Sequence, residues 1–224
     1  MARQVTLTID NGPTPGVTDA VLDVLGEHGV HALFFAVGRK TVAPPARRLV
    51  GRAVAEGHLV GSHTWSHTRT FGDADDAVVD DELDGGRRAV ADAGGDPLLF
   101  RPYGAGGAID ERLMSPHGAA RLVDDGCTCV LWSSVPGDWL DPDGWPAVAL
   151  DDIARSPWSV VVVHDVAGAA LAQLDVFLSR CVEIGAAFTT AVPDAWTPIR
   201  SGVPTCSWQL LGVGSAASPP SRGR

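Results

Sequence analysis

Residues 5–13 read VTLTIDNGP, a short apolar and β-branched run that ends in four turn-forming residues. Such a run is typical of a buried strand, and Asp-Asn-Gly-Pro is a tight-turn sequence. The segment Val160–Asp165, VVVVHD, repeats this arrangement near the other end of the chain. Both segments therefore predict buried strands that present polar side chains where they end.

Strand-like and helix-like segments alternate through most of the chain. The other predicted strands are Ala32–Val37, His58–Ser62, Leu98–Arg101, Cys127–Trp132 and Ala187–Ala191. The first predicted helix has Thr18 as its N-cap and ends at Gly29. The other predicted helices are Pro44–Ala55, Asp75–Ala93 with an interruption at Gly85-Gly86, part of Glu111–Asp125, Trp145–Arg155 and Ala167–Ile184. This alternation predicts an α/β fold with parallel strands joined by crossover helices, in a barrel or a doubly wound sheet.

The positions of the polar side chains favour the barrel. Five segments carry polar residues at or just beyond the carboxyl ends of predicted strands: Asp10-Asn11, His63, Arg101, Asp138 and His164. In a (β/α) barrel these strand ends share one face, where catalytic residues gather. We therefore predict a barrel with a functional site on that face.

The composition excludes several classes of function. The 224 residues include 45% hydrophobic and 20% charged residues, typical of a globular protein. A formal net charge of −10 argues against nucleic acid as a partner, because phosphate binding needs a basic patch. The apolar runs are strand-length, so no membrane span is predicted.

The ends of the chain and its cysteines give further expectations. Cys127 and Cys129 alternate as in a buried strand face, which favours packing over metal binding. No signal-peptide pattern follows Met1, which predicts a cytoplasmic protein, or a secreted one whose export signal has been removed. Residues 1–192 form the predicted domain, and residues 193–224, with the Ser/Pro/Gly-rich segment Gly212–Arg224, a partly disordered extension.

Three segments carry side chains with possible chemistry, and each has a structural alternative. His63 and His67 would lie on one face if their segment were helical and could bind one divalent ion, or they could simply bond to the backbone of a polar loop. Asp10-Asn11 could ligate or transfer protons, or could cap a turn. His164 could be a general acid or a structural hydrogen-bonding group.

Taken together, the segments resemble in order and spacing the polysaccharide deacetylase family, the NodB-homology carbohydrate esterases of carbohydrate esterase family 4. That family reads T-F-D-D-G-P, H-[ST]-x-x-H, R-P-P-Y, D-x-x-D-W and L-x-H. The matching stretches here are Thr8–Pro13, His63–His67, Arg101–Tyr103, Val135–Trp139 and Val162–His164. The resemblance implies a distorted (β/α)7 barrel of the NodB-homology type.

The resemblance also implies a role for each matched residue. His63 and His67 would bind a divalent metal, usually zinc, with cobalt or nickel as alternatives, and Asn11 stands at the position of the third metal ligand. The implied catalytic residues are Asp10 as general base, Arg101 to hold Asp10 in place, His164 as general acid and Asp138 to orient His164. The implied substrate-binding residues are Tyr103, near which a backbone N–H would stabilise the oxyanion together with the metal, and Trp139 and Val162, which would line the acyl site.

The chain departs from the family pattern at three positions. Asn11 replaces the second aspartate of the first motif, and a neutral amide oxygen is a weaker ligand than a carboxylate, so we expect a functional but weaker metal site. Pro102 is the only proline where the family has two, and Val135 replaces the first aspartate of the fourth motif.

The sequence therefore predicts a metal-dependent hydrolase that removes N-acetyl groups from an amino sugar in chitin-like, peptidoglycan or small glycoside substrates. The alternative within enzymes is hydrolysis of a small non-sugar amide, formamide or cyclic imide. A further alternative is a non-catalytic carbohydrate-binding homologue that has lost its metal, for which Asn11 is the supporting feature. The oligomeric state is not predicted.

Overall fold

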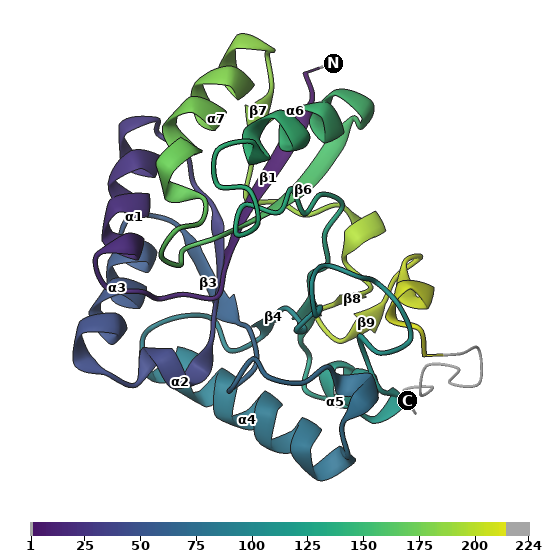
Figure 1. Cartoon of the computed structure of the whole chain (residues 1–224). Coiled ribbons are helices and arrows are strands. Elements are labelled where there is room, and N and C mark those ends of the chain that lie inside the picture. Colours follow the sequence, from purple (N-terminus) through teal and green to yellow (C-terminus); the bar gives the residue numbers. More distant parts are fainter. Residues whose placement is uncertain (1, 214–224) are drawn as a thin grey trace.

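A computed structural model describes residues 2–213 of the chain (Figure 1). Its strands are β1 (Gln4–Asp10), β2 (Leu33–Ala36), β3 (Leu59–Ser62), β4 (Leu99–Phe100), β5 (Thr128–Cys129), β6 (Trp158–His164), β7 (Ala187–Phe188), β8 (Ile199–Arg200) and β9 (Val203–Pro204). Its α-helices are α1 (Val17–Glu27), α2 (Gly38–Thr41), α3 (Pro44–Ala55), α4 (Asp76–Asp92), α5 (Pro116–Asp124), α6 (Trp145–Arg155) and α7 (Leu171–Glu183). Short 3₁₀ helices cover Phe71–Asp73, Asp194–Trp196 and Trp208–Leu211.

The strands form one curled sheet in the order β6-β1-β2-β3-β4-β5-β8-β9, and β7 also pairs with β1. Every pairing among β1 to β7 is parallel. Beyond β5, Ser134 makes a parallel bridge with Val161 of β6, which joins the two ends of the curl. Helices lie around the outside of the strands (Figure 1). The predicted distorted (β/α)7 barrel is confirmed.

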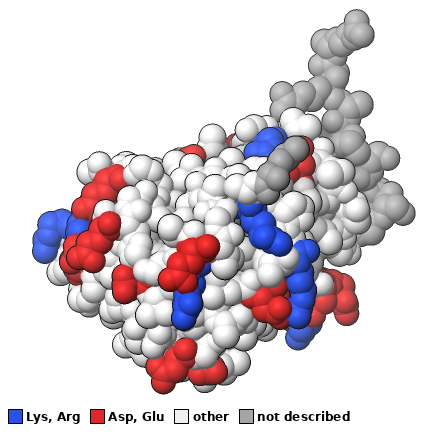
Figure 2. All heavy atoms as spheres, turned by 90° about the horizontal axis from the view of Figure 1, so that it is seen from above, with Lys and Arg blue, Asp and Glu red and all other residues white. Residues whose placement is uncertain are grey.

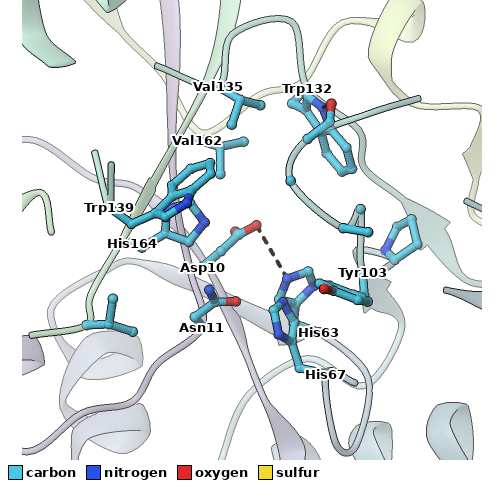
Figure 3. Close-up of a pocket in the computed structure, with 16 residues that line it drawn as sticks. Asp10, Asn11, His63, His67, Tyr103, Trp132, Val135, Trp139, Val162 and His164 are labelled. Atoms are coloured by element: carbon cyan, nitrogen blue, oxygen red, sulfur yellow. Dashed lines mark hydrogen bonds and ion pairs between the residues drawn. The ribbon is translucent and has the colours of Figure 1, made fainter. Parts of the chain in front are cut away.

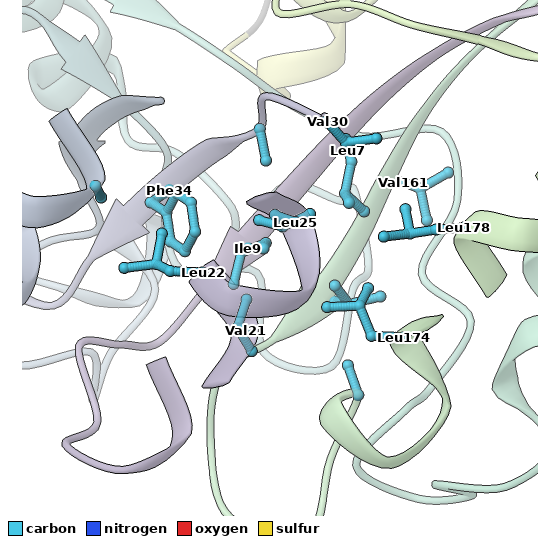
Figure 4. Close-up of a cluster of buried hydrophobic side chains, with 14 of the residues drawn as sticks. Leu7, Ile9, Val21, Leu22, Leu25, Val30, Phe34, Val161, Leu174 and Leu178 are labelled. Carbon is cyan, nitrogen blue, oxygen red and sulfur yellow. The ribbon is translucent and has the colours of Figure 1, made fainter. Parts of the chain in front are cut away.

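The alternation of side chains along β1 explains how this strand serves both the core and the site. Val5, Leu7 and Ile9 are fully buried against the outer helices, in a cluster with Leu22, Leu25, Leu174 and Leu178 (Figure 4). Successive side chains of a strand point to opposite faces, so Thr8 and Asp10 point into the barrel. Burial of the apolar side chains of β1 against the helices thus makes its polar side chains point into the barrel.

The register between β1 and β6 brings the two polar strand ends together. Thr8 is paired with Val162, and Asp10 with His164. Paired residues on adjacent parallel strands share a face, so His164 points into the same interior as Asp10. The long apolar run of β6 therefore carries a histidine to the mouth of the barrel.

The helix α4 is continuous through Gly85-Gly86, where an interruption had been predicted. A Cβ atom on Gly86 would lie 2.6 Å from the backbone carbonyl carbon of Thr64, and one on Gly85 would lie 3.3 Å from the side chain of Trp65. The two glycines therefore let α4 approach the segment that carries His63 and His67. Close packing offsets their low helix propensity, which costs about 1 kcal/mol each.

The segment after Pro193 packs onto the barrel as far as the structure describes it. Strand β8 pairs with β5 in antiparallel fashion, and Ile199, Leu211 and Val213 are buried in the cluster around β4 and β5. The domain boundary at residue 192 stays a prediction. The tail predicted to be disordered falls, beyond Val213, outside the described residues.

Two smaller expectations concern local structure. Thr18 is not the N-cap of α1, which begins at Val17, but lies in its first turn. Strand β5 is shorter than the predicted Cys127–Trp132, and Cys127 and Cys129 are buried as predicted.

The surface charges of the described residues are interspersed. Acidic and basic side chains lie side by side on the face in Figure 2 rather than in separate patches. Arg121, for example, pairs with Asp80, Asp84 and Asp125 between α4 and α5. Within residues 2–213, no helix has the length and hydropathy needed to cross a membrane.

Candidate active site

A cavity of about 210 Å³ opens at the carboxyl ends of the strands (Figure 3). It is lined from five strands or the loops that follow them, by Asp10, Asn11, His63, His67, Pro102–Gly107, Trp132, Val135, Trp139, Val162, His164 and Val166. The structure thus brings together eight of the ten predicted site residues. The other two, Arg101 and Asp138, are fully buried and bonded to lining residues.

Asp10 is held in place by a buried ion pair with Arg101. Nη1 of Arg101 donates to Oδ1 of Asp10 at 2.9 Å and to Oγ1 of Thr8 at 2.7 Å. Its remaining nitrogens donate to the carbonyl oxygens of Val130 and Leu131, and its guanidinium lies 4.2 Å from the ring centroid of Phe35. These contacts fix the guanidinium of Arg101. Because Arg101 binds Oδ1 of Asp10, Oδ2 is the carboxylate oxygen left to face the cavity.

The ring of His63 has a defined tautomer. Its Nδ1 lies 2.9 Å from the carbonyl oxygen of Arg101, and a carbonyl only accepts, so Nδ1 carries the proton. Nε2 then holds a lone pair, 3.6 Å from Oδ2 of Asp10. Burial lowers the pKa of His63 to about 3, so the ring is neutral. A neutral imidazole with a free Nε2 is a metal ligand in its usual form.

His67 reaches the same place from a loop rather than from a helix. Residues 63–67 have no helical structure, and Thr64 and His67 have positive φ angles of 61° and 57°. The ring of His67 nevertheless lies 4.6 Å from that of His63 and 4.2 Å from that of Tyr103, between centroids. Burial and the neighbouring His63 lower the pKa of His67 to about 3. The two rings therefore lie close together as predicted, but the segment that joins them is a loop and not the helix on which the prediction rested.

The side chain of Asn11 lies beside the two imidazoles (Figure 3). Its Oδ1 is buried and accepts no hydrogen bond from the described residues. A buried amide oxygen without a donor is costly unless something else satisfies it. Asn11 also has a positive φ of 78°, which asparagine tolerates better than most residues.

These side chains fit a divalent metal. Two neutral imidazoles and one unsatisfied amide oxygen converge on one place, and each is a ligand type that zinc, cobalt or nickel accepts. No group of three or more His, Cys, Asp and Glu side chains within residues 2–213 forms a metal-binding cluster. The third ligand would therefore be the amide of Asn11, which lies outside those four residue types.

His164 is oriented by Asp138 and covered by Trp139. Asp138 accepts from Nδ1 of His164 at 2.8 Å and from its backbone N–H at 2.8 Å. Burial would lower the pKa of His164, but the hydrogen bond and charge of Asp138 outweigh it and raise the pKa above its ordinary value. The ring of Trp139 stands edge-on to that of His164, with centroids 4.7 Å apart. Nε2 is the ring nitrogen left for proton transfer.

The other wall consists of Tyr103, the glycine-rich loop after it, and two apolar side chains. A Cβ atom on Gly104 would lie 2.4 Å from the ring of Trp132, so only glycine lets this loop close over the tryptophan. Val135 lies in the position of the replaced aspartate and faces Gly107. The roles predicted for Tyr103, Trp139 and Val162 stay predictions, but all three line the cavity.

Two residues near the site, Asp165 and Lys40, were not singled out from the sequence. Asp165 directly follows His164, is fully buried, and accepts from Oγ1 of Thr18 at 2.5 Å. Lys40 donates from Nζ to the backbone oxygen of Asn11 at 2.7 Å. Asp165 belongs to the VVVVHD segment, and Lys40 is the only lysine of the chain. Neither fact predicts which residue each side chain contacts.

The fold and the cavity define an α/β-barrel protein of hydrolase type, with a histidine–carboxylate site at the strand ends. The family model described as "Polysaccharide deacetylase" matches residues 1–120. The chitooligosaccharide deacetylase of Bradyrhizobium sp. (strain ANU 289) is 35% identical over 166 residues, which cover 73% of this chain and 71% of that protein. The chain belongs to the polysaccharide deacetylase family.

Two further similarities place the chain within that family. The peptidoglycan-N-acetylglucosamine deacetylase of Listeria monocytogenes is 28% identical over 191 residues, which cover 84% of this chain and only 38% of that protein. The family 4 carbohydrate esterase of Streptomyces lividans, solved in complex with acetate, superposes with a TM-score of 0.72 at 25% identity. That superposition covers 88% of this chain and 97% of the esterase.

The buried carboxyl of Asp165 gives a prediction about stability and pH. Burial raises the pKa of Asp165 to about 7, whereas an aspartate in an unfolded chain has a pKa of about 3.9. Between these values the folded protein keeps a proton that the unfolded chain has lost. Stability attributable to this group is therefore full below the lower pKa and is lost as the pH rises, by up to about 1.4 kcal/mol per pH unit.

The comparison of wild type with Asp165→Asn isolates this effect, since an amide does not titrate. Urea unfolding of both, in chelator, at about pH 4 and about pH 8 should show the wild type losing stability relative to the variant as the pH rises. An unchanged difference between the two proteins at both pH values would contradict the prediction.

Proposed function

We propose that this protein is a divalent-metal-dependent hydrolase that removes N-acetyl groups from an amino-sugar substrate. The observation that carries the proposal is the convergence in one cavity of Asp10, the His63/His67 pair and His164. A free carboxylate oxygen, two histidines that would bind the metal and an imidazole with a raised pKa line one cavity, and they would supply a base, a Lewis-acid site and an acid. The similarity to deacetylases of chitooligosaccharides and peptidoglycan supports the same chemistry.

The metal would be held by His63, His67 and Asn11, with zinc the first candidate and cobalt or nickel the others. Bound there, it would polarise the acyl carbonyl and make a water molecule more acidic.

The proton transfers are assigned to two side chains. Oδ2 of Asp10 takes the proton from the attacking water, because Arg101 occupies Oδ1 and fixes the carboxylate in the cavity wall. Nε2 of His164 gives a proton to the leaving nitrogen, because Asp138 binds Nδ1 and raises the pKa of the ring. A raised pKa favours the protonated form of the His164 ring, which is the form that a general acid requires.

The apolar part of the cavity would hold the acyl group and the sugar. Val162 and Trp139 lie beside His164, where the acyl methyl of a bound substrate would be buried. Trp139 is 38% exposed, so part of its ring is also available to a sugar face at the rim. A backbone N–H near Tyr103 would donate to the oxyanion.

Metal content and acetate release test the proposal together. The wild type should bind zinc, cobalt or nickel and release acetate from N-acetylglucosamine oligomers, and His63→Ala should lose both. His31→Ala is the matched control, because His31 is exposed and does not line the cavity. Bound metal without acetate release would move the assignment to small amides, formamides or cyclic imides, and neither metal nor activity would favour a binding protein.

A further inference from the structure

The turn that carries Asn11 is tied to the histidine loop by residues 36–40. The backbone N–H of Val37 donates to the carbonyl oxygen of Gly12 at 2.9 Å. The next two N–H groups, of Gly38 and Arg39, donate to the carbonyl oxygens of Thr64 and Trp65 at 2.9 and 3.0 Å. This short segment, which we call the bracket, therefore contacts both sides of the predicted metal site.

Lys40 adds the bracket's one side-chain bond to that turn among the described residues. Its Nζ donates to the backbone oxygen of Asn11 at 2.7 Å, from a partly buried position. Asn11 holds a left-handed conformation, which a non-glycine residue keeps only when its surroundings hold it. A hydrogen bond from a charged donor is about twice as strong as one between neutral groups.

Asp165 also contacts this turn. Its carboxylate occupies the place where a side chain on residue 12 would stand, with Oδ2 2.0 Å from an ideal Cβ on Gly12. The same Oδ2 accepts from Thr18, whose Oγ1 in turn accepts from the N–H of Thr14 at 2.7 Å. Lys40 and Asp165 thus both contact the turn.

We propose that Lys40 is a positioning residue, which fixes the Asn11 turn so that the side-chain oxygen of Asn11 faces the His63/His67 pair. The inference rests on the proposed function, because it assigns Asn11 to the metal. Lys40 does not line the cavity and touches Asn11 only through the backbone. Its influence on a ligand set therefore passes through the geometry of the turn.

A purely electrostatic role of Lys40 makes the opposite prediction. A positive charge beside a cation site weakens cation binding, so removing the charge would tighten it. The carboxyl of Asp165 lies near Lys40 and offsets part of that charge, whereas nothing among the described residues replaces its bond to Asn11. Positioning is therefore the larger of the two effects.

The first test is the affinity for Co²⁺, measured by calorimetry on the full chain. Lys40→Met keeps the length of the side chain and removes the donor, and it should bind Co²⁺ about tenfold more weakly than the wild type. Lys40→Arg keeps a charged donor and should recover most of that loss. Unchanged or tighter binding in Lys40→Met would overturn the proposal.

The second test does not depend on metal. In metal-free protein, hydrogen exchange at the Val37 amide reports the contact between bracket and turn, and it should be about tenfold faster in Lys40→Met than in wild type. The amide of Val162, which donates to the carbonyl oxygen of Ser134 and makes no bond to the bracket or the turn, is the internal control. If the wild type binds no Co²⁺, the proposed metal function fails, while equal exchange at Val37 in both proteins would reject the role of Lys40 itself.

Discussion

Changing Asn11 to aspartate is expected to tighten divalent-cation binding by about a hundredfold. The side-chain oxygen of Asn11 is buried, unsatisfied and beside two neutral imidazoles, so a carboxylate there would add one negative charge where a cation would be bound. Unit charges about 4 Å apart interact by about 4 kcal/mol at the effective dielectric of a protein surface. Desolvation of the new carboxylate takes part of that gain.

The same substitution should destabilise the protein when no metal is present. A second carboxylate beside Asp10, in a site shielded from water, raises the free energy of the folded state through repulsion and burial. Asn11→Asp should therefore unfold at a lower temperature than wild type in chelator and regain that loss when Zn²⁺ or Co²⁺ is added.

Calorimetric titration with each metal and thermal unfolding with and without it measure both effects. Gln209→Glu is the matched control, because it adds the same charge at an exposed position away from the cavity. Equal affinity in Asn11→Asp and wild type would show that residue 11 is not a ligand, and the third position would then need another group.

Local sequence patterns predicted those parts of the fold that local burial determines. Strands β1 and β6 and helices α3 and α6 follow directly from apolar runs and helical spacing, and Pro44–Ala55 and Trp145–Arg155 have the predicted bounds. The strand ends then had to meet, because parallel strands of a barrel share one face. The convergence of the five polar segments therefore follows from the sequence pattern alone.

The sequence could not predict features that depend on contacts between distant segments. Gly85-Gly86 read as an interruption because a glycine pair disfavours a helix, but here the pair allows α4 to approach Thr64 and Trp65. His67 reaches His63 through left-handed residues in a loop, which no helical spacing describes. Lys40 and Asp165 contact the Asn11 turn from 29 and 154 positions away, a separation at which periodicity carries no information.

Arg101→Met is expected to lower the free energy of unfolding by about 3–5 kcal/mol. The guanidinium is fully buried, and its loss leaves Asp10 without its ionic partner. It also leaves the carbonyl oxygens of Val130 and Leu131 without the donors they have in the wild type. Breaking one side of a buried pair costs far more than removing the pair, because the remaining charge stays buried and unpaired.

Two comparisons make this expectation specific. Arg155→Met removes an arginine that also pairs with an aspartate, Asp151, but whose side chain is 70% exposed, so its stability should change little. In the double variant Asp10→Asn with Arg101→Met, no charge is left unpaired, so urea unfolding should show part of the lost stability restored. If the double variant were as unstable as the sum of the single ones, the cost would lie in the backbone carbonyls and the packing on Phe35 rather than in the ion pair. Arg101 would then stabilise the fold mainly by its bonds to the backbone carbonyls and its packing on Phe35, and its ion pair with Asp10 would contribute little to stability.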